Sequence, residues 1–494
     1  MIAGFFKKFV VVLAATSLVL AAGVPAAEIN LPDLGSPADA VLSKNDEAQL
    51  GRAIMRQIRA GGQLVEDPQI AEYVNEIGHR IAAQANFDGN HEFSFFVVDD
   101  PTINAFALPG GFIGVHTGLL DATRNEDELA GVLAHEVAHV TQRHIARSIH
   151  ASQRRSILST AMMLGVILAS VAGGLDSEAM QGAIAITQGS AVQGQINFTR
   201  ANEYEADRIG ITALAASGFD PQGMASFFEV ISRNSGSAQS RIPAFLQTHP
   251  VSSARIAETR SRARSYAPVH TTDSVNYGIV KVRLDVANKR TPEEAVEYYE
   301  RESYEVQSDT QRYGRALAYM RDGRYPEANR IFEELTNREP HIIAYHIGLA
   351  DSQLEMEAIA AAIESYERAR KLFPRNVPLV IHYAEALLKL GQADLAHEML
   401  LDLLNNTPPT PQQVRLIARA AIEAGENAEA NYYMAEYRFM IGDLVGGVSF
   451  LRRALKVPEL EEIQRIRFEA RIDFVRDFMT EEQLQQMRMS TSIG

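Results

Sequence analysis

Cysteine is absent from the 494 residues of this chain, and several kinds of site are excluded with it. Without cysteine there is no disulfide bond, no thiolate metal ligand, no cysteine nucleophile and no lipidated N-terminal cysteine. Any metal ion must therefore be bound by histidine, aspartate or glutamate. Basic residues are also outnumbered: 47 Lys and Arg against 62 Asp and Glu give a formal net charge of −15, which argues against nucleic-acid binding.

Long hydrophobic runs are scarce as well. With 46% hydrophobic and 22% charged residues, the composition is that of globular domains and not of a polytopic membrane protein. Near the start, two lysines precede an uncharged run at 9–22, which is shorter than the about 20 residues of a membrane span. A basic start, a short apolar run and small residues are typical of a secretory signal. We therefore expect residues 1–27 to be a signal peptide, cleaved near Ala26 or Ala27, and the mature protein to lie in the periplasm.

The spacing of apolar residues predicts much of the secondary structure. The helical period predicts helices over 46–87, 126–148, 200–216 and 221–234. Residues 93–98 are β-rich, and two short β-prone runs around Pro109-Gly110-Gly111 predict a hairpin over 103–115. Residues 268–289 are β-prone too, and we expect a domain boundary there.

The C-terminal part of the chain is repetitive. Prolines and alanines recur at a fixed distance, at Pro340, Pro374 and Pro408 and at Ala328, Ala362, Ala396 and Ala430. The spacing matches the period of the tetratricopeptide repeat, a unit of two helices that is about 34 residues long. We expect about four repeats, one of them irregular, and then a helical cap. Stacked repeats form a concave surface for a peptide or helix of a partner, and a purely structural helical tail is the alternative.

The predicted helix at 126–148 contains HEVAH, residues 135–139. Side chains four residues apart lie on one face of a helix, so His135 and His139 can bind one Zn²⁺ through their imidazole nitrogens. Glu136 would lie beside the metal, where it can take a proton from the attacking water. We expect one zinc ion per chain. The pattern alone is only moderately specific, because it also arises on solvated helices.

A third ligand must come from elsewhere in the chain. The residues after His139 lack the glycine and histidine of the metzincin pattern, so that class is excluded. His144 lies about 180° around the predicted helix from His135, and we expect it to be a surface histidine. On the helix at 200–216, Glu203 and Asp207 are four residues apart, so one can bind the metal while the other orients a ligand imidazole. An ordinary acidic helix start is the alternative.

Four short motifs occur in order and at suitable distances for one known family. They are NAFALPGG (104–111), HEVAH (135–139), NEYEAD (202–207) and THP (248–250). Over roughly 45–265 the chain resembles the zinc metallopeptidases that include the CAAX prenyl protease and HtpX. With its signal sequence and C-terminal repeats, it resembles the BepA type of periplasmic protease within that family.

The resemblance implies roles for individual residues. Glu203 would be the third zinc ligand, Asp207 would orient a ligand imidazole from outside, and Glu205 would be a bystander. His249, in the THP motif, would act at the site in one of two ways. If it stabilises the oxyanion, His249→Ala should lose activity; if it fills the open coordination position and holds the enzyme latent, the same substitution should raise activity.

The hairpin supplies the candidate substrate-binding residues. Its edge at Asn104–Leu108 can pair with an extended peptide backbone by strand addition, which needs little sequence preference. We therefore expect Asn104, Ala105 and Phe106 to bind substrate. Plain structural pairing within the protein is the alternative.

A second uncharged run, Ile157–Leu175, approaches the length of a membrane span. A single crossing there would put His139 and Glu203 on opposite sides of a bilayer, where they could not share one zinc ion. We expect 150–198 to form a mobile helical hairpin beside the active site that covers the cleft or touches a membrane. A buried core helix is the alternative.

The expected fold is mainly α (α+β): a gluzincin-like helical metallopeptidase domain with a small β-sheet or hairpin, followed by an α-solenoid of tetratricopeptide repeats. The expected domains are a signal peptide (1–27), a zinc metallopeptidase domain (28–268), a linker and helix (269–305) and a tetratricopeptide-repeat domain (306–494).

By resemblance, the protein is expected to be a periplasmic zinc endopeptidase, with chaperone activity, for the assembly and quality control of outer-membrane β-barrel proteins, including the lipopolysaccharide translocon. Its repeats would bind barrel proteins and their assembly machinery; no nucleic acid is expected as a partner, and peripheral membrane contact stays open. Two rivals are a non-proteolytic periplasmic chaperone or adaptor scaffold and an inner-membrane protease of the HtpX kind. An intact Glu136 weakens the first rival, because a structural zinc site needs no general base.

Overall fold

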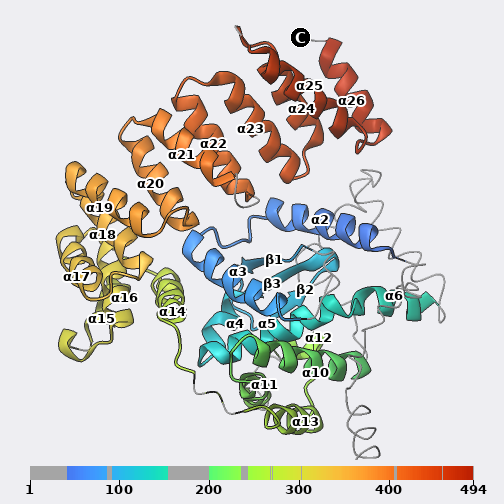
Figure 1. Cartoon of the computed structure of the whole chain (residues 1–494), viewed down its shortest axis with the longest axis vertical. Helices are drawn as coiled ribbons and strands as arrows, with labels where there is room; N and C mark the ends of the chain where they lie inside the picture. Colours follow the sequence, from blue (N-terminus) through green and yellow to red (C-terminus); the bar gives the residue numbers. More distant parts are fainter. Residues whose placement is uncertain are drawn as a thin grey trace, which may run out of the picture.

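The computed structural model describes residues 42–492 except 86–91, 154–199, 235–242, 268, 270, 302, 405–408 and 459. The expected signal peptide, the run Ile157–Leu175 and Pro408 lie outside the described residues. Within them the chain is mainly helical with one three-stranded sheet, so the expected fold class is confirmed. Figure 1 shows an N-terminal part around the sheet and an arc of helices beside it.

The N-terminal part combines the sheet with helices on both of its faces. Its elements are α2 (Lys44–Ala60), α3 (Pro68–Ala82), β1 (Ser94–Val98), β2 (Ala105–Ala107), η2 (Pro109–Gly111), β3 (Phe112–His116), α4 (Thr117–Ala122), α5 (Glu126–Thr141), α6 (His144–Gln153), α10 (Arg200–Ala216), α11 (Gln222–Asn234), α12 (Ala244–Thr248) and α13 (Ser253–Ala263).

The sheet has the strand order β1-β3-β2, which leaves β2 at an edge. Strand β1 runs parallel to β3, whereas β2 and β3 form the predicted antiparallel hairpin. The hairpin turns at Gly110 and Gly111, whose φ angles of 78° and 88° favour glycine. Alternate residues of β2 face opposite sides: Phe106 packs in a cluster with Met55 of α2, and Ala107 belongs to the main core that contains α5.

Helix α5 is the centre of the N-terminal core, because every residue from Asp127 to His139 is buried. It packs against α3, α10, α11 and β2. The predicted helix at 126–148 is wrong in one respect: it breaks at Arg143, where φ is 51°, and α6 continues in a new direction. Contacts with the start of the described chain hold the break, since Arg143 donates to Glu47 Oε2 at 3.0 Å and to the Leu42 carbonyl at 2.7 Å.

The β-prone segment 268–289 contains a helix and not a strand, α14 (Val275–Asn288), which begins at the cap Ser274. Its apolar residues serve two cores. Tyr277, Val280 and Leu284 pack into the N-terminal core, and Ile279 packs into the first core of the helical array. A helix buried on more than one side lacks a clear polar face, so its period was hidden in the sequence.

The C-terminal helical array follows α14. Its elements are α15 (Pro292–Glu300), η3 (Tyr304–Val306), α16 (Asp309–Arg321), α17 (Tyr325–Arg338), α18 (Ile343–Glu355), α19 (Ile359–Leu372), α20 (Val377–Lys389), α21 (Ala393–Leu404), α22 (Pro411–Glu423), α23 (Asn427–Met440), α24 (Leu444–Ala454), α25 (Glu462–Arg476) and α26 (Glu481–Ser492). The periodic alanines all lie buried on the second helix of successive pairs, at Ala328, Ala362, Ala396 and Ala430. The repeat pattern therefore marks the close packing of paired helices.

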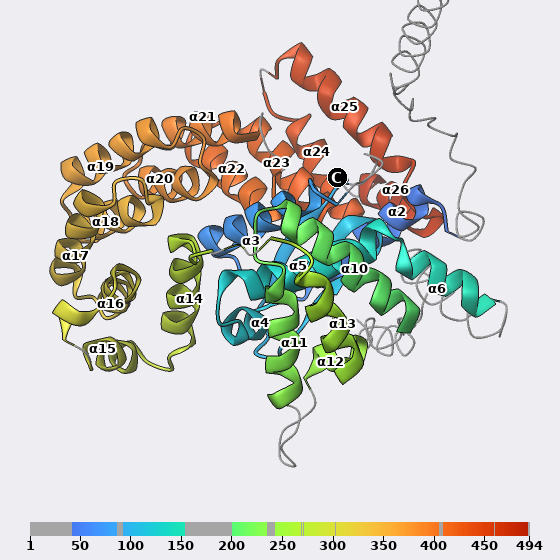
Figure 2. The ribbon, with the colours of Figure 1, turned by 60° about the horizontal axis from the view of Figure 1, so that its bottom comes forward.

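The array curves around the α2 and α3 side of the N-terminal part (Figures 1 and 2). Polar contacts cross between the two parts at several points along the curve, namely Arg283 to Asp67, Asn376 to Glu72 and Gln412 to Glu66.

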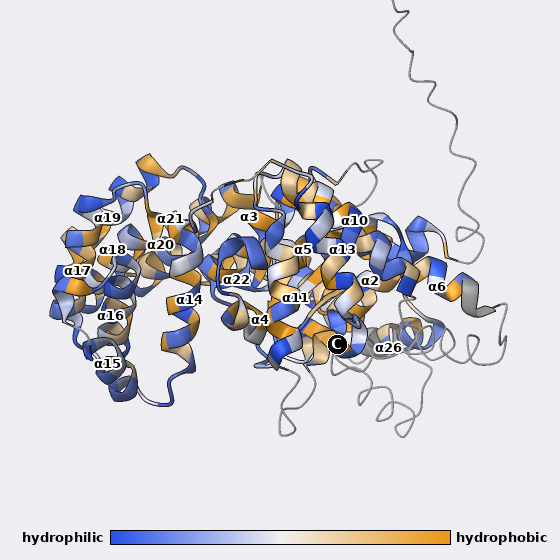
Figure 3. Cartoon of the chain, turned by 90° about the horizontal axis from the view of Figure 1, so that it is seen from below, coloured by the Kyte–Doolittle hydropathy of each residue, from blue (hydrophilic) through white to orange (hydrophobic). Residues whose placement is uncertain are grey.

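The labelled helices mix hydrophobic and hydrophilic residues (Figure 3). Among the described residues, no helix has both the length and the apolar character needed to cross a membrane.

Candidate metal centre

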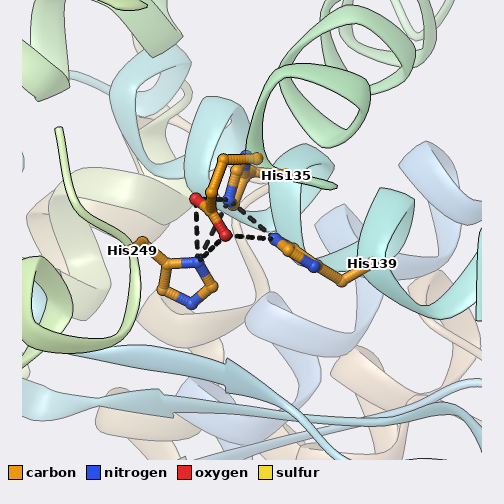
Figure 4. A group of neighbouring side chains, drawn as sticks. His135, His139 and His249 are labelled. Atoms are coloured by element: carbon orange, nitrogen blue, oxygen red, sulfur yellow. Dashed lines mark hydrogen bonds and ion pairs between the residues drawn. The ribbon is translucent and has the colours of Figure 1, made fainter. Parts of the chain in front are cut away.

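Three separate segments bring their side chains to one buried point. Helix α5 carries His135 and His139, α10 carries Glu203, and His249 follows α12. The three labelled imidazoles in Figure 4 point toward one another. All four side chains are at most 2% exposed, and they offer ligand atoms that lie within 4.8 Å of one another. Close packing of α10 on α5 makes this possible, because a Cβ at Gly210 would lie only 3.0 Å from the Ala134 carbonyl oxygen.

Five of the distances between the donor atoms are close to those around one tetrahedral zinc ion. The Nε2 atoms of His135 and His139 are 3.0 Å apart, and each lies 3.5 Å from a Glu203 oxygen. His249 Nδ1 lies 3.3 Å from His135 Nε2 and 3.2 Å from Glu203 Oε1. Zinc bonds of about 2.0–2.1 Å imply tetrahedral edges of about 3.3 Å. Three nitrogens and one carboxylate are also ligands that zinc accepts, so the residues present fit the ion.

The electrostatics of the cluster favour a bound cation. Burial opposes the charge of Glu203, but the neighbouring His249 and His135 outweigh it and hold the pKa of Glu203 far below its usual range. Burial also disfavours charge on His135, yet Asp207 and Glu203 raise its pKa to about 9. Burial opposes the charge of Asp207 too, but His135 and Arg255 hold its pKa below its usual range, so both carboxylates are ionised and would stabilise a divalent ion.

Asp207 lies behind His135, as the resemblance implied. Its Oδ1 is 3.0 Å from His135 Nδ1, on the side of the ring away from the cluster. Arg255 of α13 holds Asp207 in a two-pronged contact at 2.7 and 2.8 Å and also donates to Glu203 Oε2 at 2.8 Å. Sequence reasoning missed Arg255, since a single arginine six positions after His249 carries no motif of its own.

The prediction that His144 is a surface histidine is wrong. His144 is fully buried, and its Nδ1 lies 2.9 Å from Nδ1 of His139. The reason is the break at Arg143: counting 100° per residue fails once the helix ends, and α6 brings His144 back against α5. Burial lowers the pKa of His144 to about 4. Glu205, expected to be a bystander, lies 3.3 Å from His144 Nε2.

Glu136 is buried beside the cluster without an ordinary partner. Among the described residues, neither of its carboxylate oxygens has a hydrogen-bond partner, and His249 Nε2 lies 3.5 Å from Oε1. Burial raises the pKa of Glu136, with His249 opposing it. A carboxylate buried with so few polar partners is costly, which is typical of a catalytic group kept ready for a proton.

The three candidate substrate residues are all buried at the edge strand and just before it. Asn104 Oδ1 has no hydrogen-bond partner among the described residues, while the Asn104 carbonyl accepts from the His116 backbone. Ala105 belongs to the core shared with α5. The Phe106 ring faces the opposite side of the sheet, and its backbone lies opposite Gly114 in the pairing with β3.

Comparisons with known proteins agree with the motifs. A model of peptidase family M48 matches residues 68–263, and a tetratricopeptide repeat model matches residues 353–422. The putative beta-barrel assembly-enhancing protease of Vibrio cholerae is 34% identical over 449 residues, which cover 90% of this chain and 92% of that protein. The beta-barrel assembly-enhancing protease of Escherichia coli K12 is 34% identical over 451 residues, 90% of this chain and 91% of that protein. The mitochondrial metalloendopeptidase OMA1 of Schizosaccharomyces pombe is 34% identical over 184 residues, 37% of this chain and 50% of that protein.

The resemblance seen in the four motifs is thus confirmed over almost the whole chain. A match across nine-tenths of both proteins spans the peptidase region and the repeat region together. The chain belongs to the family of beta-barrel assembly-enhancing proteases, which joins a peptidase family M48 domain to tetratricopeptide repeats.

Proposed function

We propose that this zinc metalloendopeptidase acts in the periplasm on outer-membrane β-barrel proteins that fail to assemble, and that it also assists their assembly. One observation carries the proposal: His135, His139 and Glu203 converge next to the fully buried Glu136. The names of the relatives that match nine-tenths of the chain, beta-barrel assembly-enhancing proteases, support the barrel substrate.

The roles of the side chains follow from their positions. Bound zinc supplies a Lewis acid that polarises the scissile carbonyl and acidifies water. His135, His139 and Glu203 would hold the ion, and Asp207 would fix the orientation of the His135 ring. Glu136 would accept the proton of the attacking water and then return it to the leaving amine. Burial supports this last role, since it raises the pKa of Glu136 toward that of a group that both accepts and donates.

For His249, the distances favour the latent role over the oxyanion role. Its Nδ1 lies among the ligand atoms at tetrahedral spacing, where it would fill the position that a water needs. We therefore expect His249→Ala to raise peptidase activity several-fold in a zinc-loaded enzyme. Peptide cleavage by purified wild type and variant is the measurement, and a loss of activity in the variant would instead favour the oxyanion role.

Substrate would bind along β2. This strand lies at the edge of the sheet, and the unpaired Oδ1 of Asn104 lies just before it. Pairing with an extended backbone suits an enzyme whose substrates are misfolded proteins of different sequences, because backbone hydrogen bonds do not depend on the side chains. Ala105 would contribute its outward backbone groups, whereas Phe106 lies opposite Gly114 in the pairing with β3 and would hold the strand in place.

The helical array would bring clients to the peptidase. Tetratricopeptide repeats build extended surfaces for other proteins, and we propose barrel proteins and their assembly machinery as partners. We propose the domains to be a signal peptide at 1–27, the peptidase at 28–268, a linker and helix at 269–305 and the repeats at 306–494. Export through that signal peptide would deliver the chain to the periplasm.

The decisive experiment changes the proposed base. Glu136→Gln should bind zinc like wild type, because the side chain keeps its shape. Its rate of cleavage of a misfolded barrel protein should fall by at least about a thousandfold, because the proton acceptor is gone. The measurement combines metal content with cleavage by the full-length chain. A variant that cleaves normally would reject the mechanism. A variant that fully restores barrel assembly in cells would favour the non-proteolytic chaperone.

The inner-membrane rival needs a separate test. Carbonate extraction of membranes should release the mature chain into the supernatant. Retention in the membrane pellet would favour an inner-membrane protease.

A further inference from the structure

His139 presents one nitrogen to the metal cluster and the other to His144. Its Nε2 is 3.0 Å from His135 Nε2, and its Nδ1 is 2.9 Å from His144 Nδ1. Both rings are buried and are held nearly edge to face, with centroids 4.8 Å apart. A contact this short between two imidazole nitrogens requires one of them to carry the proton and the other to accept it.

The direction of this hydrogen bond follows from the metal site. A neutral histidine that binds zinc through Nε2 carries its proton on Nδ1. His139 therefore donates and His144 Nδ1 accepts. A neutral His144 then has its proton on Nε2, which lies 3.3 Å from Glu205 Oε2. The same Glu205 oxygen accepts from Arg147 Nη1 at 2.9 Å, so the chain of donors and acceptors ends on a cation.

The two ligand histidines are thus supported differently. Behind His135 stands a buried carboxylate, Asp207, at 3.0 Å. Behind His139 stands a buried imidazole, and the carboxylate of Glu205 is one step farther out and 34% exposed. The helix break at Arg143 brings His144 to this position. At the break, the Arg143 side chain donates a hydrogen bond to Glu47 of α2.

We propose that His144 is a positioning residue that fixes the tautomer and orientation of the zinc ligand His139, and that Glu205 in turn orients His144. This inference rests on the proposed zinc site. It extends that site by an outer relay, from His139 through His144 and Glu205 to Arg147.

The test measures zinc affinity in the full-length chain by competition with a chromogenic chelator. His144→Leu fills the space without an acceptor and should weaken zinc binding about 10–100-fold, as loss of an outer hydrogen bond to a ligand histidine does. His144→Asn should recover most of that affinity, because the Asn side-chain oxygen stands where Nδ1 stood. The absorption spectrum of the Co²⁺-substituted protein should change in the Leu variant and return toward wild type in the Asn variant.

Zinc affinity of Glu205→Ala is a second measurement, and it does not require substitution of a buried residue. Glu205 is partly exposed, so its removal should leave the fold intact and weaken zinc binding several-fold. The matched control is Glu258→Ala on α13, an exposed acid whose arginine contacts are 3.7 Å long, and it should bind zinc like wild type.

Two results would overturn the proposal. One is a folded His144→Leu or Glu205→Ala variant that holds zinc as tightly as the control. The other is a His144→Asn variant that is as weak as His144→Leu, since the position would then matter for packing alone. Failure of the zinc site itself would be distinguishable, because then the wild type would bind no stoichiometric zinc.

Discussion

At the scale of single residues, the Arg255 side chain contacts two buried carboxylates of the metal centre at once. It is 2% exposed and contacts both Glu203 and Asp207, the two carboxylates that His135 also contacts. Without its guanidinium, two buried carboxylates would lose a charged hydrogen-bond donor that water cannot replace, which is strongly destabilising. The metal ligand and the residue behind His135 therefore depend on a side chain that touches no substrate.

We predict that Arg255→Met, which keeps most of the volume, lowers the unfolding free energy of the zinc-free protein by about 3–5 kcal/mol. Zinc should restore part of the loss, since the ion neutralises Glu203. Urea unfolding with and without zinc is the measurement. The control is Arg290→Met, whose contact with Glu294 is at the surface and whose loss should cost about 0–1 kcal/mol. Equal losses in both variants would contradict the prediction.

At the scale of secondary-structure elements, the site depends on how closely helices approach α5. A Cβ on Gly131 would lie 2.7 Å from both the Cα and the backbone nitrogen of Met224 at the start of α11. Backbone atoms cannot move aside as a flexible side chain can. The absence of a side chain at Gly131 therefore sets the distance between the two helices.

We predict that Gly131→Ala destabilises the protein by about 1–3 kcal/mol, because overpacking forces α11 away from α5. Chemical denaturation of the full chain measures this. The matched control is Gly61→Ala, where φ is −72° and a Cβ would meet nothing closer than 3.4 Å. The control should change the free energy of unfolding by less than about 0.5 kcal/mol. A similarly small change for Gly131→Ala would contradict the prediction, because α5 and α11 would then accommodate a methyl group between them.

At the scale of the whole molecule, the carboxyl group of Glu72 lies where the helical array meets the N-terminal part. Glu72 of α3 accepts hydrogen bonds from the side chain of Asn376 at 3.0 and 3.1 Å. Asn376 is also the N-cap of α20, so the contact joins a peptidase helix to the start of a repeat helix. Burial raises the pKa of Glu72 to about 7 from an ordinary value of 4.5, although the Asn376 amide opposes the shift.

The sign of the pH effect follows from linkage. Because the folded pKa exceeds the unfolded one, the folded protein binds more protons between pH 4.5 and about 7. The contribution of Glu72 is fully present below pH 4.5 and is lost as the pH rises to about 7. We predict that Glu72→Gln removes this dependence, so that its stability relative to wild type improves by up to about 3 kcal/mol from pH 4.5 to pH 8.

Urea unfolding at the two pH values tests this effect. The control is Glu297→Gln on α15, an exposed carboxyl group whose replacement should leave the pH dependence of wild type unchanged. If Glu72→Gln and Glu297→Gln respond to pH alike, burial of Glu72 at this contact does not govern the stability of the two-part arrangement.

The sequence by itself determined the local features. HEVAH places two imidazoles on one helical face whatever surrounds it, and the alanine and proline period is written into each repeat. The hairpin at Pro109-Gly110-Gly111 was also predictable, because two glycines there adopt positive φ angles. These features depend on residues a few positions apart, and backbone geometry links such residues directly.

Only the tertiary structure decided what lies around those features. His144 faces His139 because contacts from Glu47 and Leu42 hold the helix break, and no periodicity in 126–148 reveals contacts from so far away. Helix α14 looked β-prone because its apolar residues serve two cores at once. Arg255 acquired its role only when α13 packed beside α10. The physical reason is the same in each case: side chains distant in sequence share one buried environment, and their positions depend on packing and charge and not on local spacing.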